Sequence, residues 1–169
     1  MERQERERRY ISEYMLATWP EGGWQLNVPL GPIPEYLIKG HGLAMATAIY
    51  RPTRPRVDAV KWTPDTYYLI EAKVREIKAG IGDLVFYRGM ATQGPDLPNY
   101  DGQKISFRLV VPWSIDWIAQ AAAAQDIEMV VFSQPWIEDY VRGRQHYFTA
   151  EYRDERAEKM RLRRALGVD

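Results

Sequence analysis

Apolar side chains recur every three to four residues near the N-terminus and then gather into short runs separated by proline and glycine. Tyr10, Ile11 and Tyr14 follow the helical repeat, so residues 2–17 are predicted to form a helix that ends before Pro20. The later runs are rich in β-branched, aromatic and aliphatic residues, which is typical of strands. The predicted strands cover residues 24–30, 57–62, 67–74, 105–112 and 127–133.

Helical periodicity and turn residues predict the remaining elements. The predicted helices cover residues 76–90, 114–125, 136–148 and 150–166, with a short helix at 43–50. Ser114 is the expected N-cap of the helix at 114–125. Prolines and glycines predict loops at 31–42, 51–56 and 92–103. The order of the elements predicts an α/β protein with a mixed central β-sheet flanked by helices.

The length of 169 residues predicts one α/β domain at 1–148 with an insertion at 31–56, followed by a charged C-terminal helix at 149–169. Hydrophobic residues make up 46% of the chain and charged residues 27%, which is the balance of a globular protein. No apolar run is long enough to span a membrane, and the charged N-terminus lacks the pattern of a signal peptide. We therefore expect a cytoplasmic protein without a membrane partner.

The absence of cysteine excludes disulfide scaffolds, thiol nucleophiles and cysteine-ligated metals. His41 and His146 are the only histidines, so carboxylates are the expected ligands of any bound metal. Carboxylate ligands favour hard cations such as Mg²⁺ and Mn²⁺.

The 23 basic and 23 acidic residues give a net charge of zero, so a nucleic-acid partner would need a local basic cluster. Arg51, Arg54 and Arg56 lie on a proline-spaced segment directly before a predicted strand, and Arg75 follows the next strand. These arginines are the candidate contacts to DNA phosphates, and a solvated connector is the alternative. The C-terminal helix at 149–169 mixes both signs of charge, which favours a solvated helix or an oligomer contact.

The predicted hairpin carries the clearest chemistry. Asp58 lies on its first strand, and Glu71 and Lys73 lie on one face of its second strand. Their neighbours are apolar, and burying charged groups there costs several kcal/mol unless they are paired or bind a metal. The two carboxylates and the carbonyl of Ala72 can hold a divalent cation, while Lys73 orients or deprotonates a water molecule. This set suits the hydrolysis of a phosphodiester.

The arrangement resembles the PD-(D/E)XK nuclease superfamily. Its motif corresponds here to Asp58, Glu71, Ala72 and Lys73. Twelve residues separate the two acids, and Val57 takes the place of the motif's proline. The resemblance implies the restriction-endonuclease-like αβββαβ core and hydrolysis of DNA that depends on Mg²⁺ or Mn²⁺. Among its members, Holliday junction resolvases and small bacteriophage nucleases are similar to this chain, which implies a homodimer or a higher homo-oligomer that cuts branched DNA, in the host cytoplasm if a phage encodes it.

The resemblance also implies roles for residues outside the motif. Some members carry Gln-x-x-x-Tyr on the helix after the lysine, where this chain has Asp83 and Tyr87. Tyr87 is therefore a candidate catalytic residue, with a plain core position as the alternative. Some members use a glutamate of the first helix, for which Glu13 is the candidate metal ligand and Glu7 lies behind it. The alternative for Glu13 is a solvated helix position.

Two further interpretations compete with an active nuclease. The three charged residues of the hairpin could form a surface ion-pair ladder on an exposed strand. The fold could also lack activity and serve phage or host assembly through oligomer contacts of the insertion and the tail helix. The intact set of Asp58, Glu71 and Lys73 favours the enzyme, whereas the zero net charge and the missing glutamine favour the assembly protein.

Overall fold

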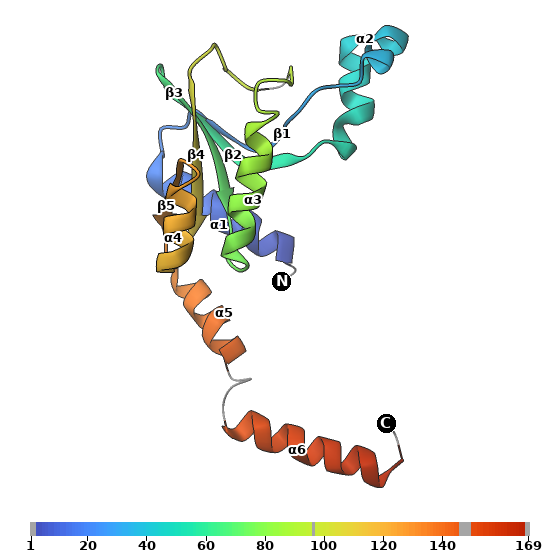
Figure 1. Cartoon of the computed structure of the whole chain (residues 1–169), viewed down its shortest axis with the longest axis vertical. Coiled ribbons are helices and arrows are strands. Elements are labelled where there is room, and N and C mark those ends of the chain that lie inside the picture. The colour runs from blue at the N-terminus through green and yellow to red at the C-terminus, as the bar shows by residue number, and fades with distance from the viewer. Residues whose placement is uncertain (1–2, 96, 146–149, 168–169) are drawn as a thin grey trace. The chain divides into compact units, whose positions relative to one another are not determined.

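The computed structural model describes residues 3–95, 97–145 and 150–167 and contains a five-stranded β-sheet (Figure 1). The strands are β1 (Trp24–Pro29), β2 (Arg56–Trp62), β3 (Thr66–Ala72), β4 (Lys104–Val111) and β5 (Ile127–Val131). They lie side by side in chain order. The first three pair antiparallel, whereas β4 pairs parallel to both β3 and β5. The predicted α/β class with a mixed sheet is confirmed.

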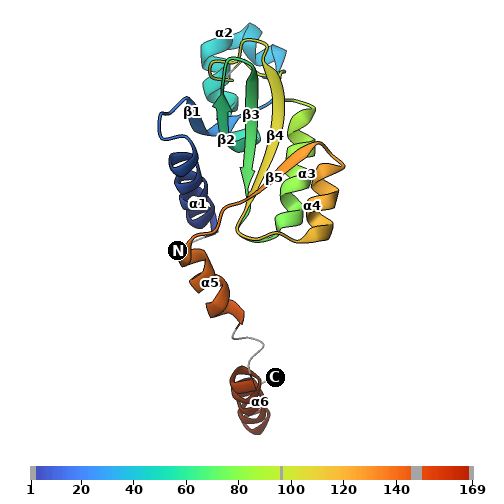
Figure 2. The ribbon, with the colours of Figure 1, turned by 90° about the vertical axis from the view of Figure 1, so that its left-hand side faces the viewer.

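Helices cover both faces of this sheet (Figure 2). They are α1 (Arg3–Thr18) on one face and α3 (Ile77–Arg88) and α4 (Asp116–Ala123) on the other. Side chains alternate between the two faces along each strand. On the α1 face, the rings of Trp19 and Tyr68 lie 6.2 Å apart, and the Arg108 guanidinium lies over both of them. On the opposite face, Leu69 and Leu109 are fully buried beneath α3.

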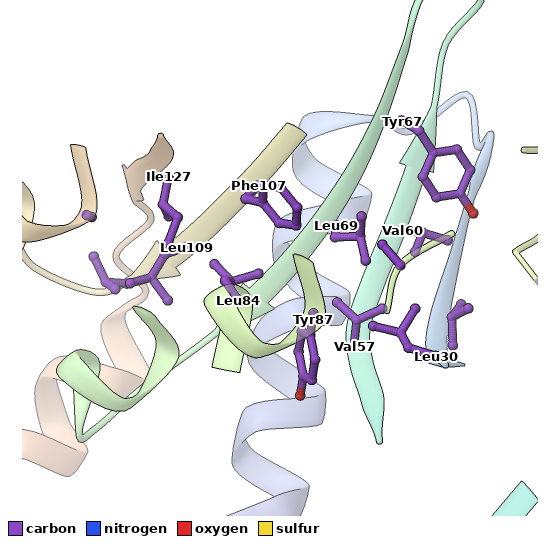
Figure 3. Close-up of a cluster of buried hydrophobic side chains, with 14 of the residues drawn as sticks. Leu30, Val57, Val60, Tyr67, Leu69, Leu84, Tyr87, Phe107, Leu109 and Ile127 are labelled. Carbon is purple, nitrogen blue, oxygen red and sulfur yellow. The ribbon is translucent and has the colours of Figure 1, made fainter. Parts of the chain in front are cut away.

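The main hydrophobic cluster lies between the sheet and the pair α3 and α4 (Figure 3). Its labelled members come from the strands β2 to β5, from the segment directly after β1 and from α3: Leu30, Val57, Val60, Tyr67, Leu69, Leu84, Tyr87, Phe107, Leu109 and Ile127. Each fully buried side chain of this size contributes about 1.5–3 kcal/mol through removal of apolar surface from water. The cluster therefore fixes α3 against β3 and β4. This helix follows the candidate site in the sequence.

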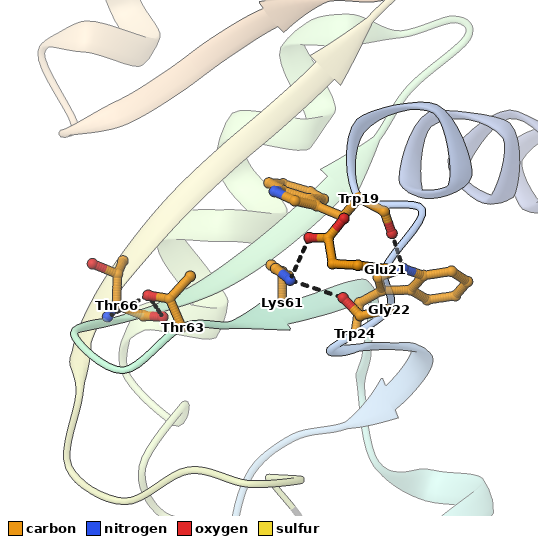
Figure 4. Close-up of polar contacts among 7 residues, drawn as sticks. All are labelled: Trp19, Glu21, Gly22, Trp24, Lys61, Thr63 and Thr66. Carbon is orange, nitrogen blue, oxygen red and sulfur yellow. Dashed lines mark hydrogen bonds and ion pairs between the residues drawn. The ribbon is translucent and has the colours of Figure 1, made fainter.

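The connection between α1 and β1 is fixed to the sheet through Lys61 (Figure 4). The Lys61 ammonium, on a side chain only 8% exposed, donates to the Gly22 carbonyl at 2.8 Å and lies 3.4 Å from Glu21. At the far end of β2, the Thr63 hydroxyl and the Thr66 backbone close the turn of the hairpin. The β2–β3 hairpin is thus stabilised at its turn and, through Lys61, along β2.

The largest departure from the predicted elements is α2 (Glu35–Tyr50), which follows Pro34 and continues into the 3₁₀ turn Arg51–Thr53. The prediction of a loop at 31–42 is wrong from residue 35 onward. Proline is compatible with a helix start, and of the two glycines in this stretch only Gly42 leaves the helical region, with φ 75°. Gly42 therefore kinks the helix and does not end it.

Two smaller expectations are also wrong. The α4 helix begins at Asp116 after an extended Ile115, so Ser114 is not its N-cap. The continuous apolar run at 127–133 is typical of a strand covered on both faces, but β5 lies at the edge of the sheet and Val131 is 51% exposed. Apolar content predicts burial of a strand, whereas its position in the sheet decides how much of it is covered.

The contacts divide the chain into two compact units, residues 1–132 and 133–169. The second unit contains α5 (Pro135–Gln145) and α6 (Ala150–Ala165), so helices are present where the sequence predicts them. The last residues of the predicted helix at 136–148, with His146, lie outside the described residues. Within the ranges that the structure describes, no helix is long and apolar enough to cross a membrane.

Candidate active site

The hairpin register brings Asp58 beside the end of β3. Ala59 pairs with Ile70, so the next position on each strand carries an acid, Asp58 on β2 and Glu71 on β3. The backbone amide of Ala72 donates to Asp58 Oδ2 at 2.9 Å. The predicted proximity of the two acids is therefore present, and Glu71 is only 4% exposed.

Lys73 completes this group from just beyond the strand. The predicted strand at 67–74 is too long, because β3 ends at Ala72, but the Lys73 amide still donates to the Val110 carbonyl of β4 at 3.0 Å. The Lys73 ammonium lies 2.6 Å from Glu71 Oε1 and 2.8 Å from Asp83 Oδ2. A surface ion-pair ladder does not describe these contacts, because the Glu71 and Lys73 side chains are only 5% and 11% exposed.

Burial and like charge oppose ionisation of both acids. Burial and then the charge of Asp58 raise the pKa of Glu71 to about 8, although Lys73 lowers it. Burial also raises the pKa of Asp58 to about 6, against the Ala72 hydrogen bond and the charge of Lys73. Burial disfavours the charged form of Lys73, but Glu71 and Asp83 outweigh it and hold the pKa of Lys73 above its ordinary value. The site therefore gathers several acidic side chains around the single ammonium of Lys73, which is what opposes their simultaneous ionisation.

One carboxylate oxygen in this group lacks a partner. Among the described residues, Glu71 Oε2 is buried and makes no hydrogen bond, whereas Oε1 accepts from Lys73. A buried unsatisfied oxygen is costly, and a bound cation would remove that cost. The described part of the chain holds no cluster of three acidic, histidine or cysteine side chains suited to a metal. Asp58 and Glu71 are two neighbouring carboxylates that can hold a cation together, and carboxylate oxygens are hard ligands of the kind that Mg²⁺ and Mn²⁺ prefer.

The acid of α1 that acts on this site is Glu7. Its charge raises the pKa of Asp58. Glu13, the candidate from the sequence, has its carboxylate 2.7 Å from Arg9 Nε on the same helix. The direction of α1 across the sheet decides which acid comes near β2, and the helical repeat alone carries no information on that direction.

Tyr87 supports the site from α3. Its hydroxyl donates to the Arg56 carbonyl at 3.0 Å, and burial with the nearby charge of Glu71 raises its pKa. The contact joins α3 to the first residue of β2, two positions before Asp58. This geometry gives Tyr87 a positioning role in addition to its place in the hydrophobic cluster.

The four candidate DNA-binding arginines divide by exposure. Arg54 is 4% exposed, and its guanidinium donates to the carbonyls of Leu30 and Gly31. A phosphate contact does not fit this buried position, and that expectation is corrected. Arg51 and Arg75 are exposed, and Arg56 is partly buried with a contact to the Arg51 carbonyl. A dense spacing of arginine and proline does not distinguish an arginine that binds carbonyls from one that faces solvent.

Comparison with known proteins identifies no relative. No family, no curated protein and no solved structure matches this chain.

Proposed function

We propose that this protein is a divalent-metal-dependent deoxyribonuclease with the restriction-endonuclease-like core. The observation that carries the proposal is the buried, unpaired Oε2 of Glu71 beside Asp58, with the Lys73 ammonium already in contact with the same carboxylate. A metal-dependent phosphodiester hydrolase requires carboxylates that bind a cation and a positive group close to them. Here two carboxylates that oppose each other's ionisation lie beside one ammonium.

Each residue has a separate task in the proposed reaction. A bound Mg²⁺ or Mn²⁺ supplies a water of lowered pKa and neutralises charge on the phosphate. Asp58 and Glu71 bind the cation, together with the Ala72 carbonyl. Lys73 orients the attacking water and stabilises negative charge that develops on the phosphate. Tyr87 holds the first residue of β2 and so fixes the position of Asp58.

The proposed substrate is branched DNA, and the proposed active form is a homodimer in the cytoplasm. The resemblance to small resolvases and phage nucleases supports this choice. The exposed arginines Arg51 and Arg75 lie seven residues before Asp58 and two residues after Lys73, so both are close in sequence to the proposed site. Contacts of this kind to phosphates give affinity without sequence specificity.

A cleavage assay tests the proposal. Purified protein is incubated with Mg²⁺ or Mn²⁺ and labelled duplex, single-stranded, flap and four-way-junction DNA. Asp58→Asn and Lys73→Met should each lose cleavage by about 10²–10⁴-fold, which is the range for a positioned acid–base or charged group. Asp65→Asn, at an exposed position in the β2–β3 turn, is the matched control and should retain cleavage. Absence of cleavage on every substrate by a folded wild-type protein contradicts the proposal.

A second function is favoured by the exposed apolar side chains of α2. Tyr36 is 71% exposed, Leu43 51%, Met45 56% and Ile49 48%. Apolar residues gathered on one exposed helix are typical of a contact surface, which supports an assembly protein with a silent nuclease fold. Such a protein would tolerate Glu71→Ala and Lys73→Met, and it would lose self-association when the α2 residues are made polar.

A further inference from the structure

Lys73 is shared between two carboxylates on different elements. Its ammonium lies 2.6 Å from Glu71 Oε1 on β3 and 2.8 Å from Asp83 Oδ2 on α3. Lys73 and Glu71 are buried, whereas the Asp83 side chain is 40% exposed. An ammonium has three donors and no preferred plane, so its position is set by the acceptors around it. Asp83 therefore decides where the ammonium rests relative to Glu71.

The packing of α3 places Asp83 at this distance. Gly80 lies three residues before Asp83, and a Cβ at Gly80 would come within 2.4 Å of Leu109 Cδ1 and 3.0 Å of Lys73 Cγ. The absence of a side chain at Gly80 lets the helix rest against the stem of Lys73. Tyr87 lies four residues after Asp83 and donates to the Arg56 carbonyl, which fixes the same buried face of the helix further along its length. Asp83 is thus held between two close contacts of the same helix with the sheet.

Because Lys73 is shared with Asp83, its ammonium contacts only one of the two carboxylate oxygens of Glu71. With Asp83 as the second acceptor, Lys73 occupies Oε1 and leaves Oε2 without a partner. Without the Asp83 carboxylate, the ammonium has no competing anion and is free to move over Glu71 and towards Asp58. It would then compete with a cation for the same two carboxylates, and one negative charge close to the cation would also be missing.

We propose that Asp83 is a positioning residue that holds the Lys73 ammonium on Glu71 Oε1 and thereby keeps Glu71 Oε2 and Asp58 open to a divalent cation. The inference rests on the proposed function, because it assigns the cation to the same two acids. It differs from a ligand role for Asp83, because Asp83 acts through Lys73.

The test measures Mn²⁺ binding by the full-length protein, with electron paramagnetic resonance of free Mn²⁺, separately from DNA cleavage. The variants are Asp83→Asn, Asp83→Glu and Asp58→Asn, and Asp65→Asn is the control that removes one exposed acid elsewhere. We expect Asp83→Asn to raise the Kd for Mn²⁺ about 10–100-fold, as for residues that orient metal ligands. Asp83→Glu should restore most of the affinity, and Asp65→Asn should leave it unchanged.

A second measurement separates positioning from loss of stability. Thermal unfolding without metal should show Asp83→Asn to be folded and only slightly less stable than the wild type, because an ion pair with a partner as exposed as Asp83 contributes little to stability. At saturating Mn²⁺, Asp83→Asn should still cleave more slowly than the wild type, because Lys73 is no longer fixed.

The outcomes distinguish the two proposals. An Asp83→Asn protein that binds Mn²⁺ within twofold of the wild type, while Asp58→Asn does not bind it, overturns the role of Asp83 and leaves the nuclease intact. A wild type that binds Mn²⁺ but cleaves no DNA contradicts the proposed nuclease activity. The Mn²⁺ affinity of Asp83→Asn then decides the role of Asp83 by itself. A wild type that does not bind Mn²⁺ overturns both.

Discussion

Glu71 occupies a position at which its charge is opposed from several directions. Its side chain is buried, Asp58 and Asp83 act on it with like charge, and one of its oxygens lacks a partner among the described residues. Lys73 offsets part of this cost through Oε1. Without a cation, the lowest-energy state of the group therefore keeps a proton up to a higher pH than an exposed glutamate would.

This proton predicts the pH dependence of stability. The pKa of Glu71 is about 8 in the folded chain against an ordinary 4.5, and that of Asp58 is about 6 against 3.8. Because the folded state binds more protons than the unfolded state between these values, the contribution to stability is complete below about pH 4 and is lost as the pH rises to about 8. We expect the metal-free protein to lose several kcal/mol across this interval, because each pKa unit corresponds to about 1.4 kcal/mol.

Urea unfolding in EDTA from pH 5 to pH 8 measures this loss. Glu71→Gln should flatten the profile, because the amide does not titrate. Glu35→Gln, an exposed acid of α2, should leave the slope as in the wild type. A wild-type stability that increases over the interval would contradict the protonation of Glu71. Added Mn²⁺ should restore stability most at the higher pH, where both carboxylates are ionised and available.

At the scale of the elements, α3 links the hydrophobic core to the site. It buries Leu84 and Tyr87 in the cluster, brings Asp83 to the Lys73 ammonium and joins the Tyr87 hydroxyl to the Arg56 carbonyl. Two glycines of this helix have different surroundings. Gly80 touches Leu109 and Lys73, whereas nothing lies within 4 Å of a Cβ built at Gly82. Gly82 therefore provides a control on the same helix for a substitution at Gly80 that alters the packing of α3 against the sheet.

Gly80→Ala should destabilise the protein by about 1–3 kcal/mol, because the added methyl overpacks a close helix–sheet contact. It should also lower Mn²⁺ affinity, because α3 and Asp83 move away from Lys73. Gly82→Ala should stabilise the protein by up to ~1 kcal/mol, since alanine is the better helix former at an open position. Chemical unfolding and Mn²⁺ titration of both variants check the pair. Equal effects of the two substitutions would contradict the close approach at Gly80.

The sequence predicts the elements that local pattern controls and misses features that depend on tertiary neighbours. The hairpin pattern places Asp58 opposite Glu71, and the structure agrees. The helix predicted at 43–50 is present, but the first half of α2, residues 35–42, is missed because glycine and proline are read as loop signals. The burial of Arg54 is missed as well, because its acceptors are carbonyls 23 and 24 residues away. Such long-range partners leave no periodic signal in the sequence.

Arg54 and Arg51 should therefore respond differently to substitution. Arg54→Met removes the donor to the Leu30 and Gly31 carbonyls and should cost about 2–3 kcal/mol, the range for buried hydrogen bonds to a charged group. Arg51→Ala, at an exposed position, should leave stability within about 0.5 kcal/mol. It should weaken DNA binding and reduce the dependence of binding on salt by about one phosphate contact. Weakened DNA binding without loss of stability in Arg54→Met would contradict the structural role of Arg54.

At the scale of the whole molecule, the candidate site and the charged tail belong to different units. Every residue of the site, from Glu7 to Tyr87, lies within residues 1–132, whereas α6 lies within 133–169. The described side chains of α6 from Asp154 onward are exposed and include the large apolar residues Met160 and Leu162, and Leu166 directly after the helix is exposed as well. A helix of 16 residues gains little stability alone, so the exposed apolar side chains of α6 are a candidate contact surface for the proposed homodimer.

Deletion of residues 150–169 should therefore separate catalysis from assembly. We expect the shortened protein to keep its Mn²⁺ affinity and its cleavage rate per site within about twofold, because no donor of the site lies in the deleted segment. If the tail mediates the proposed homodimer, the mass measured by light scattering should fall to that of one chain. Loss of cleavage without loss of Mn²⁺ binding would show that the second chain is needed to hold DNA. Loss of self-association in a protein that never cleaves DNA would instead favour the assembly function, since the tail would then carry the activity and the acids of the hairpin would not.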